Sequence, residues 1–238
     1  MSSLFAHRSH QVEIMDDLQC QGEVVHQTLR ELEFINKWLG GNAVTLEGVK
    51  QLTRDHTCET LFIADLGCGG GDMLKLLAEW GRRNNRSLKL IGIDANPYII
   101  EFARNNCCSY SEISFETLDI FLPEFQQKKY DIIMGTLFYH HFDNKVLIGF
   151  FSKLIHQARL GLVINDIHRH WLAFYSIRLL TKFFSKSSMV IFDAPLSVLR
   201  AFTKEELVDI LGRAGIQKFQ LRWRWAFRWQ ITASKAFV

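Results

Sequence analysis

The sequence predicts an α/β fold in which strands and helices alternate along one domain. An apolar, partly β-branched run at residues 61–66 is followed by a glycine cluster at 67–71 and by helical spacing of apolar residues at 73–80. The same order of apolar run and helical pattern returns at residues 88–106 and 130–157. A glycine loop between a buried strand and a helix lets the backbone approach a ligand at the carboxyl ends of the strands.

Length and composition fit this fold. The 238 residues, 48% of them apolar, are enough for one α/β domain with a sizeable core and a modest extra segment. The net charge of +3 gives no indication of a nucleic-acid or anionic partner. No run approaches the ~18 apolar residues of a membrane span, and the first residues lack a signal-peptide core. The cysteines contain no C-x-x-C pair, as is typical of free thiols in a cytoplasmic protein. They are Cys20, Cys58, Cys68, Cys107 and Cys108.

The spacing of the glycine loop distinguishes two nucleotide-type cofactors. The dinucleotide pattern G-x-G-x-x-G/A would place its third small residue at Asp72, where a carboxylate would face a pyrophosphate. Read instead as D-x-G-x-G-x-G, the segment matches at Asp65, Gly67, Gly69 and Gly71. With this spacing the chain resembles the class I methyltransferases that depend on S-adenosylmethionine (SAM).

The resemblance covers about residues 60–233. It implies a Rossmann-like, seven-stranded and mostly parallel sheet with its last strand antiparallel, and SAM bound across the strand ends. Residues 1–58 are expected to form a helical N-terminal extension that acts as a lid. Residues 59–238 would form the SAM-binding domain, with a helical cap inserted at about 167–200.

Asp94 is the first residue expected to bind the cofactor outside the glycine loop. It ends the strand predicted at residues 88–93, about 20 positions past the loop, and suits two ribose hydroxyls. A helix N-cap before Asn96 is the alternative role, and Asp94 could serve both. The resemblance implies further that Asp119 meets the adenine amino group and that Ile120 packs on the ring. It also places Ala95 and Thr136 among the cofactor-binding residues.

The segment at residues 136–142 indicates which chemistry to expect. It lacks the Asn/Asp-Pro-Pro-aromatic motif of enzymes that methylate exocyclic amines, and it lacks the cysteine of cytosine C5 enzymes. It resembles the loop of ubiquinone/menaquinone-type and small-molecule methyltransferases, where a histidine follows a short apolar stretch. Because methyl transfer from a sulfonium needs an aligned nucleophile, we expect no metal site. His141 is a candidate base for a phenol proton, whereas His140 is expected to bond backbone.

His168 is the second candidate base, and it rivals His141. Asn165, Asp166 and His168 follow the strand predicted at residues 159–166 and should face the same cleft as the glycine loop. An Asp two residues from a His could hold the imidazole in the tautomer needed for proton abstraction.

The first 60 residues are expected to be helical. A helical pattern ends at Gly40-Gly41, and a second short helix is predicted near residues 46–52. Arg8, Met15, Asp16 and Arg30 are candidate ligand contacts in this region.

The insertion from Trp171 to Arg200 is rich in apolar residues, with Arg178, Lys182 and Lys186 between them. We interpret it first as a cap over a bulky apolar or aromatic substrate. Contact with a second copy in a homodimer is the next alternative, and contact with a membrane surface comes last, without stable insertion.

The tail at residues 219–231 interleaves Arg and Trp, which can indicate a platform for single-stranded nucleic acid. Strict alternation also predicts an antiparallel strand pair with one apolar and one cationic face. We favour the strand pair, because the family ends its sheet this way and the net charge is low. No nucleic-acid partner is therefore expected.

The function that these features predict is methyl transfer to a small apolar or aromatic molecule, with a phenolic hydroxyl as the first choice and C-methylation of a quinol ring as its nearest variant. The stretch at residues 165–207 resembles bacterial methyltransferases of phenolic-lipid and polyketide pathways. An RNA methyltransferase and a non-catalytic SAM-binding scaffold are the alternatives.

Overall fold

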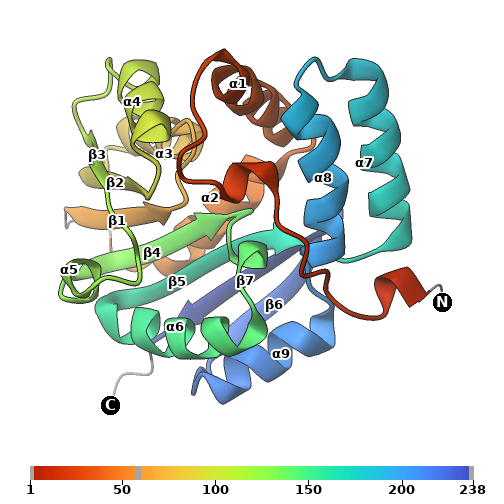
Figure 1. Cartoon of the computed structure of the whole chain (residues 1–238). Helices are drawn as coiled ribbons and strands as arrows, with labels where there is room; N and C mark the ends of the chain where they lie inside the picture. The colour runs from red at the N-terminus through yellow and green to blue at the C-terminus, as the bar shows by residue number, and fades with distance from the viewer. Residues whose placement is uncertain (1–2, 57–59, 236–238) are drawn as a thin grey trace.

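One mixed seven-stranded sheet organises the chain (Figure 1). The structure is a computed structural model that describes residues 3–56 and 60–235. The strand order is β3-β2-β1-β4-β5-β7-β6; β1 to β5 run parallel, and β7 pairs antiparallel with both of its neighbours. The predicted fold class is therefore confirmed. The strands are β1 Leu61–Leu66, β2 Leu88–Asp94, β3 Ile113–Thr117, β4 Tyr130–Thr136, β5 Ala158–Ile167, β6 Phe219–Arg224 and β7 Arg228–Ser234.

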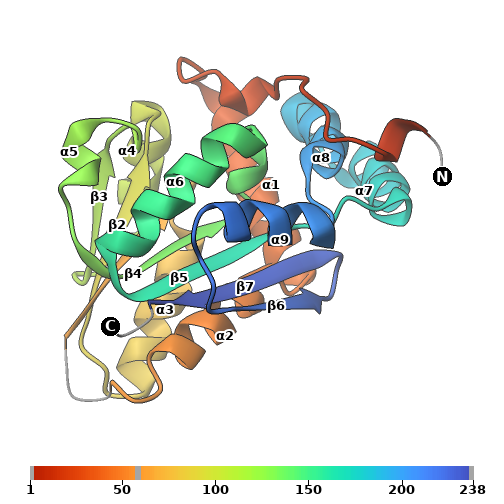
Figure 2. The ribbon, with the colours of Figure 1, turned by 90° about the horizontal axis from the view of Figure 1, so that it is seen from below.

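Helices cover both faces of the sheet. In Figure 2, α6 and α9 lie on one side of the strands, while α2 and α3 lie on the other. The helices are α1 Glu23–Trp38, α2 Gly41–Leu52, α3 Asp72–Arg83, α4 Pro97–Asn106, α5 Pro123–Gln126, α6 Asn144–Gln157, α7 Trp171–Phe184, α8 Ser188–Arg200 and α9 Lys204–Arg213. Three short 3-10 turns complete the set: η1 Ser3–Phe5, η2 Ile14–Asp16 and η3 Tyr139–His141.

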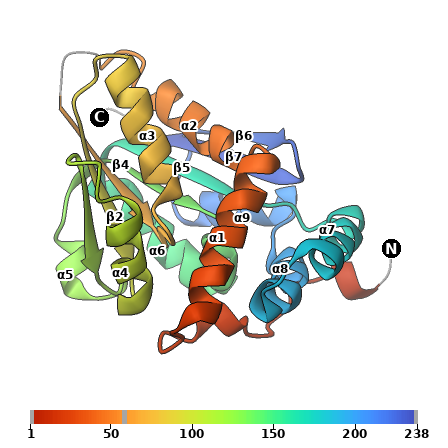
Figure 3. The ribbon, with the colours of Figure 1, turned by 90° about the horizontal axis from the view of Figure 1, so that it is seen from above.

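Three helices lie beyond the carboxyl ends of the parallel strands. α1, α8 and α7 stand next to one another there, as Figure 3 shows. The N-terminal strap, which we define as residues 4–22, runs past α8 before it enters α1 (Figure 1).

In residues 3–56 and 60–235, no helix is both long and apolar enough to cross a membrane. Four of the five cysteines are free thiols, and Cys58 lies outside the described residues.

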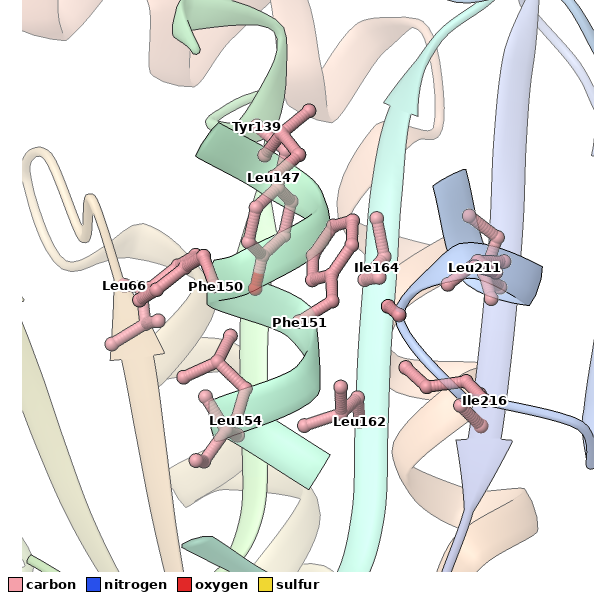
Figure 4. Packing of buried hydrophobic residues seen from close by; sticks show 14 of the residues in the cluster. Leu66, Tyr139, Leu147, Phe150, Phe151, Leu154, Leu162, Ile164, Leu211 and Ile216 are labelled. Carbon is pink, nitrogen blue, oxygen red and sulfur yellow. The ribbon is translucent and has the colours of Figure 1, made fainter. Parts of the chain in front are cut away.

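The main core lies between β5 and α6 (Figure 4). Phe151 of α6 is fully buried there, together with Leu162 and Ile164 of β5. Alternate residues of β7 extend this core, because Trp229 and Ile231 point toward the same side of the sheet.

Helix α2 covers the other side of β7. The tail forms the predicted antiparallel pair, and the polar face of β7 packs against α2. Gln230 donates its side-chain N–H to the carbonyl of Val44 at 2.6 Å, and Arg228 is 4% exposed. A Cβ on Gly48 would lie 2.6 Å from Val163, so a glycine is required where α2 approaches the sheet.

One element boundary differs from the sequence prediction. α2 begins at Gly41, directly after Gly40 in the left-handed conformation, and not near residue 46. β3 ends at Thr117, and Asp119 then accepts the backbone N–H of Phe121 at 2.9 Å in the turn that follows.

Replacing Phe151 by alanine should lower the free energy of unfolding by about 3–5 kcal/mol, because the cavity left in a dense core closes only in part. Urea unfolding of both proteins would measure the loss. Phe183→Ala is the matched control, since that side chain is 69% exposed. Equal losses for the two variants would contradict the assignment of the core.

Candidate active site

A cavity of about 940 Å³ lies at the carboxyl ends of the parallel strands. Its wall combines the glycine loop after β1, the end of β2, the turn after β4, the N-terminal strap and the inner faces of α1, α7 and α8. Ligands of open α/β sheets bind at this edge, so the cavity is the candidate active site.

Most residues predicted to bind the cofactor line this cavity. They are Asp65, Gly67, Gly69, Asp94, Ala95, Asp119, Ile120 and Thr136. Gly71 is described by the structure but is not part of the lining. It is the N-cap of α3 at φ +79°, and a Cβ there would lie 2.7 Å from the Cys107 sulfur. Gly71 therefore serves the close packing of the loop.

The other two glycines differ in their surroundings. Gly67 has φ +63°, and a Cβ on it would lie 2.1 Å from the ring of Phe138. Gly69 has φ +51°, and its missing Cβ would face open space except for Leu29 at 3.7 Å. A side chain on Gly69 would thus project into the cavity, where a ligand needs close access to backbone.

Asp65 presents an unsatisfied acid beneath the loop. It is 2% exposed, and its Oδ1 finds no hydrogen-bond partner among the described residues. Burial raises the pKa of this carboxyl to about 8, and the carboxylates of Asp72 and Asp94 add to the effect. A ligand ammonium group would supply the missing charge and donor, so Asp65 fits the amino-acid part of SAM.

The N-cap role considered for Asp94 belongs to Asn96. The Asn96 side chain accepts the N–H groups of Tyr98 and Ile99 at the start of α4. Asp94 instead accepts the backbone N–H of Asn96 at 3.0 Å and lines the cavity. Burial raises its pKa, although the backbone N–H groups of its loop oppose the shift.

Asp166 fixes the turn after β4. This fully buried carboxylate accepts the backbone N–H groups of Tyr139 at 2.9 Å and His140 at 3.1 Å. Its Oδ1 lies 2.7 Å from Nδ1 of His140. The expectation that Asp166 orients His168 is therefore wrong, and His140 bonds a carboxylate where backbone was expected.

His141 is held by the N-terminal strap. Its Nδ1 lies 2.5 Å from Oδ1 of Asp16, and Arg200 donates to the other oxygen of that carboxylate at 2.5 Å. Arg200 also donates to the carbonyl of His141 at 2.7 Å. Burial favours a raised pKa for Asp16, but the hydrogen bonds and charges of His141 and Arg200 outweigh it and hold the pKa below its ordinary value. The ring of His141 is thus fixed beside an ionised acid.

Glu13 lies next to this pair. It is 4% exposed, and burial raises its pKa to about 7, although His141, Arg200 and a hydrogen bond from Ser197 oppose the shift. Its Oε1 makes no hydrogen bond in the described part of the chain and lies 3.7 Å from Nε2 of His140. Potential metal-ligating atoms of Glu13, His140 and His141 lie within 4.8 Å of one another. Arg200 already places positive charge 3.4 Å from that Glu13 oxygen.

His168 lies apart from these groups and does not line the cavity described above. Its ring packs against those of Trp229 and His170, with centroids 4.8 and 5.4 Å away. Burial lowers its pKa, and His170 adds to the effect. Asn165 was expected to face the cleft, but its side-chain amide donates to the carbonyl of Gly41 in α2 at 2.8 Å. The end of β5 contributes Ile167 to the cavity instead.

The strap also lines the cavity. Arg8, Met15 and Asp16 belong to the lining as expected, whereas Arg30 is exposed and pairs with Glu23. Arg8 donates to the carbonyls of Phe142 at 2.9 Å and His140 at 2.7 Å, so it joins the strap to the turn after β4.

Glu13, Asp193, Ser197 and Arg200 are among the polar lining residues that sequence reasoning missed. Asp193 accepts the backbone N–H groups of Ile14 and Met15, and Ser197 donates to Glu13. The sequence signal for three of them is that residues 193, 197 and 200 are polar and recur at helical spacing, so that they share one face of an otherwise apolar helix.

Comparison with known proteins identifies the family. A family model described as a methyltransferase domain matches residues 60–191, which is more than half of the chain. The chain belongs to this methyltransferase domain family. It is a SAM-dependent methyltransferase, and SAM is its cofactor. A search of curated proteins gave no match.

Solved structures share the fold at low sequence identity. The plantazolicin methyltransferase BpumL, in complex with a triazolic desmethylPZN analog and S-adenosylhomocysteine, is 14% identical with a TM-score of 0.67, over 87% of this chain and 90% of that one. A Nostoc punctiforme PCC 73102 protein assigned as an O-methyltransferase is 18% identical with a TM-score of 0.56, over 83% and 57%. The CurJ carbon methyltransferase is 14% identical with a TM-score of 0.61, over 82% and 54%. This chain thus spans less than two thirds of the last two structures.

Replacing Asp94 by alanine should weaken SAM binding by at least about tenfold, because the ribose hydroxyls would lose their acceptor. Calorimetric titration of SAM and S-adenosylhomocysteine would measure both affinities. Asp209→Ala is the matched control, since that exposed carboxylate on α9 lies outside the cavity lining. Unchanged affinity in Asp94→Ala would contradict the placement of the ribose.

SAM binding near neutral pH should release about one proton from Asp65, because its carboxyl is protonated below pH about 8 in the free protein and ionised beside an ammonium group. Affinity should therefore rise with pH up to about 8. Titrations in buffers of different ionisation enthalpy would count the proton. Asp65→Asn should abolish the release, and a release that persists in this variant would assign it to another group.

Proposed function

We propose that this protein transfers the methyl group of SAM to a hydroxyl oxygen of a small apolar or aromatic molecule, with a phenol as the first choice. One observation carries the proposal: the His141–Asp16 pair lies in the same cavity as the glycine loop and Asp94. In this proposal a proton acceptor lies in the same cavity as the methyl donor.

The role of His141 follows from its hydrogen bonds. When Nδ1 donates to the ionised Asp16, Nε2 carries the lone pair and can take a proton from a hydroxyl. The carboxylate then stabilises the imidazolium that forms, while Arg200 holds the carboxylate in place. Bound SAM would supply an electrophilic methyl group, whose transfer to the oxygen would form the C–O bond, break the C–S bond and leave S-adenosylhomocysteine.

The cavity wall supports an apolar acceptor. Beyond the polar cluster, α7 and α8 contribute mostly apolar side chains to it. They are Ala173, Ile177, Leu180, Val190, Ala194 and Val198. In this proposal the segment from about 167 to 200 acts as the substrate cap, and the strap with α1 acts as the lid of residues 1–58.

C-methylation of a quinol ring is the second candidate, because the same His141 could deprotonate the ring hydroxyl and activate the neighbouring carbon. The carbon methyltransferase CurJ shares the fold.

The tail gives little support to an RNA substrate, since Arg228 is buried and Arg224 pairs with Glu47 at 2.8 Å. No metal forms part of the proposal, because Arg200 provides the positive charge beside Glu13.

Replacing His141 by glutamine should lower kcat by about 10²-fold or more, because the hydroxyl loses its proton acceptor, with little change in SAM affinity. Steady-state assays of S-adenosylhomocysteine release over a panel of phenols and quinols would measure it. His168→Gln is the matched control and should keep its activity, since that ring lies outside the cavity lining.

A loss in His168→Gln with full activity in His141→Gln would reverse the assignment of the base. Product analysis by NMR would separate O-methylation from C-methylation. SAM binding without any S-adenosylhomocysteine release would favour the scaffold alternative.

A further inference from the structure

The outer faces of α7 and α8 expose a cluster of large apolar side chains. Phe184 is 81% exposed and Phe183 is 69% exposed, which is unusual for aromatic residues on a helical surface. We call this cluster the cap surface. It consists of Trp171, Leu172, Tyr175, Leu179, Phe183, Phe184, Ile191 and Phe192.

The charges within residues 167–192 have one sign, and Glu31 of α1 accepts the backbone N–H of Lys186 at 2.9 Å beside them. The sequence from 167 to 192 contains no Asp or Glu, and Arg178, Lys182 and Lys186 are exposed on and after α7. Exposed aromatic and aliphatic side chains with flanking cations are typical of helices that lie in the interface of an anionic bilayer.

The helix that carries most of the cap surface also lines the cavity. Ile177 and Leu180 of the same helix line the cavity from within, while Leu179 is 60% exposed on the outside. Trp225, at the turn between β6 and β7, lines the cavity and is also 69% exposed. Trp38 at the end of α1 is 77% exposed beside the lining residue Leu39. The apolar exposed groups therefore lie near the rim of the candidate active site.

We propose that the cap surface docks on an anionic lipid surface. A second copy of this chain is the less suitable occupant, because a twofold contact through this face would bring the cations Arg178, Lys182 and Lys186 toward the same cluster of the other copy. The 14 residues of α7 span about 21 Å, which is less than the ~30 Å of a hydrocarbon core, so the helix lies along the interface.

Docking in this way would present the rim of the cavity to the bilayer. An acceptor dissolved in the lipid could then enter beside α7 without crossing water. This last consequence rests on the proposed function, whereas lipid binding itself does not.

Vesicle flotation with the full chain tests the proposal. Wild-type protein should float with vesicles of phosphatidylglycerol mixed with phosphatidylcholine, and about tenfold less with phosphatidylcholine alone or at high salt. Phe183→Ser/Phe184→Ser and Lys182→Glu/Lys186→Glu should each reduce flotation by a similar factor. Lys129→Glu/Lys153→Glu, which changes one lysine just before β4 and one on α6, is the charge-matched control and should float like the wild type.

SAM titration of every variant would show that it is folded, and sedimentation equilibrium would give its oligomeric state. Absence of flotation with anionic vesicles, or flotation that neither double variant reduces, would overturn the proposal. A wild-type dimer that Phe183→Ser/Phe184→Ser dissociates would overturn it in favour of a second copy. Because flotation needs no methyl transfer, its outcome is independent of whether the proposed acceptor is right.

Discussion

The candidate site depends on one buried carboxylate. Asp166 has no solvent exposure, and it binds two backbone N–H groups and the ring of His140 across the ends of β4 and β5. Burial alone would raise its pKa, but the charge and hydrogen bond of His140 outweigh burial and keep the pKa low. The ionised carboxylate therefore fixes a turn that would otherwise carry unpaired buried amides, and His141 takes its position from that turn.

Around this fixed point the cavity divides into two parts with different origins. The cofactor part comes from the strand ends and the glycine loop, whose geometry the sheet determines. The acceptor part comes from the strap and α8, which are held together by Asp193, Ser197 and Arg200. Glu13, Asp16 and His141 lie together in the acceptor part, where Arg200 pairs with both carboxylates.

The cofactor part could be predicted from the sequence because its signals are local. Asp65, the glycines and Asp94 follow directly from where two strands end. The acceptor part could not be predicted from the sequence, because Asp16 and Arg200 are 184 positions apart and no periodicity links them. The prediction that Asp166 orients His168 failed for a physical reason. Residues two apart share a face of a sheet only while the strand continues, and β5 ends at Ile167.

The strap makes no strand pairing, yet it delivers Asp16 to the histidine that we assign as base. Substitutions there would leave the sheet and its cofactor contacts intact while changing the polarity and shape presented to the acceptor. A lineage of such enzymes would therefore keep its glycine loop, Arg8 and Asp16, and diversify at the strap residues between them. In comparisons among relatives, acceptor preference should track this short N-terminal stretch more closely than it tracks the fold.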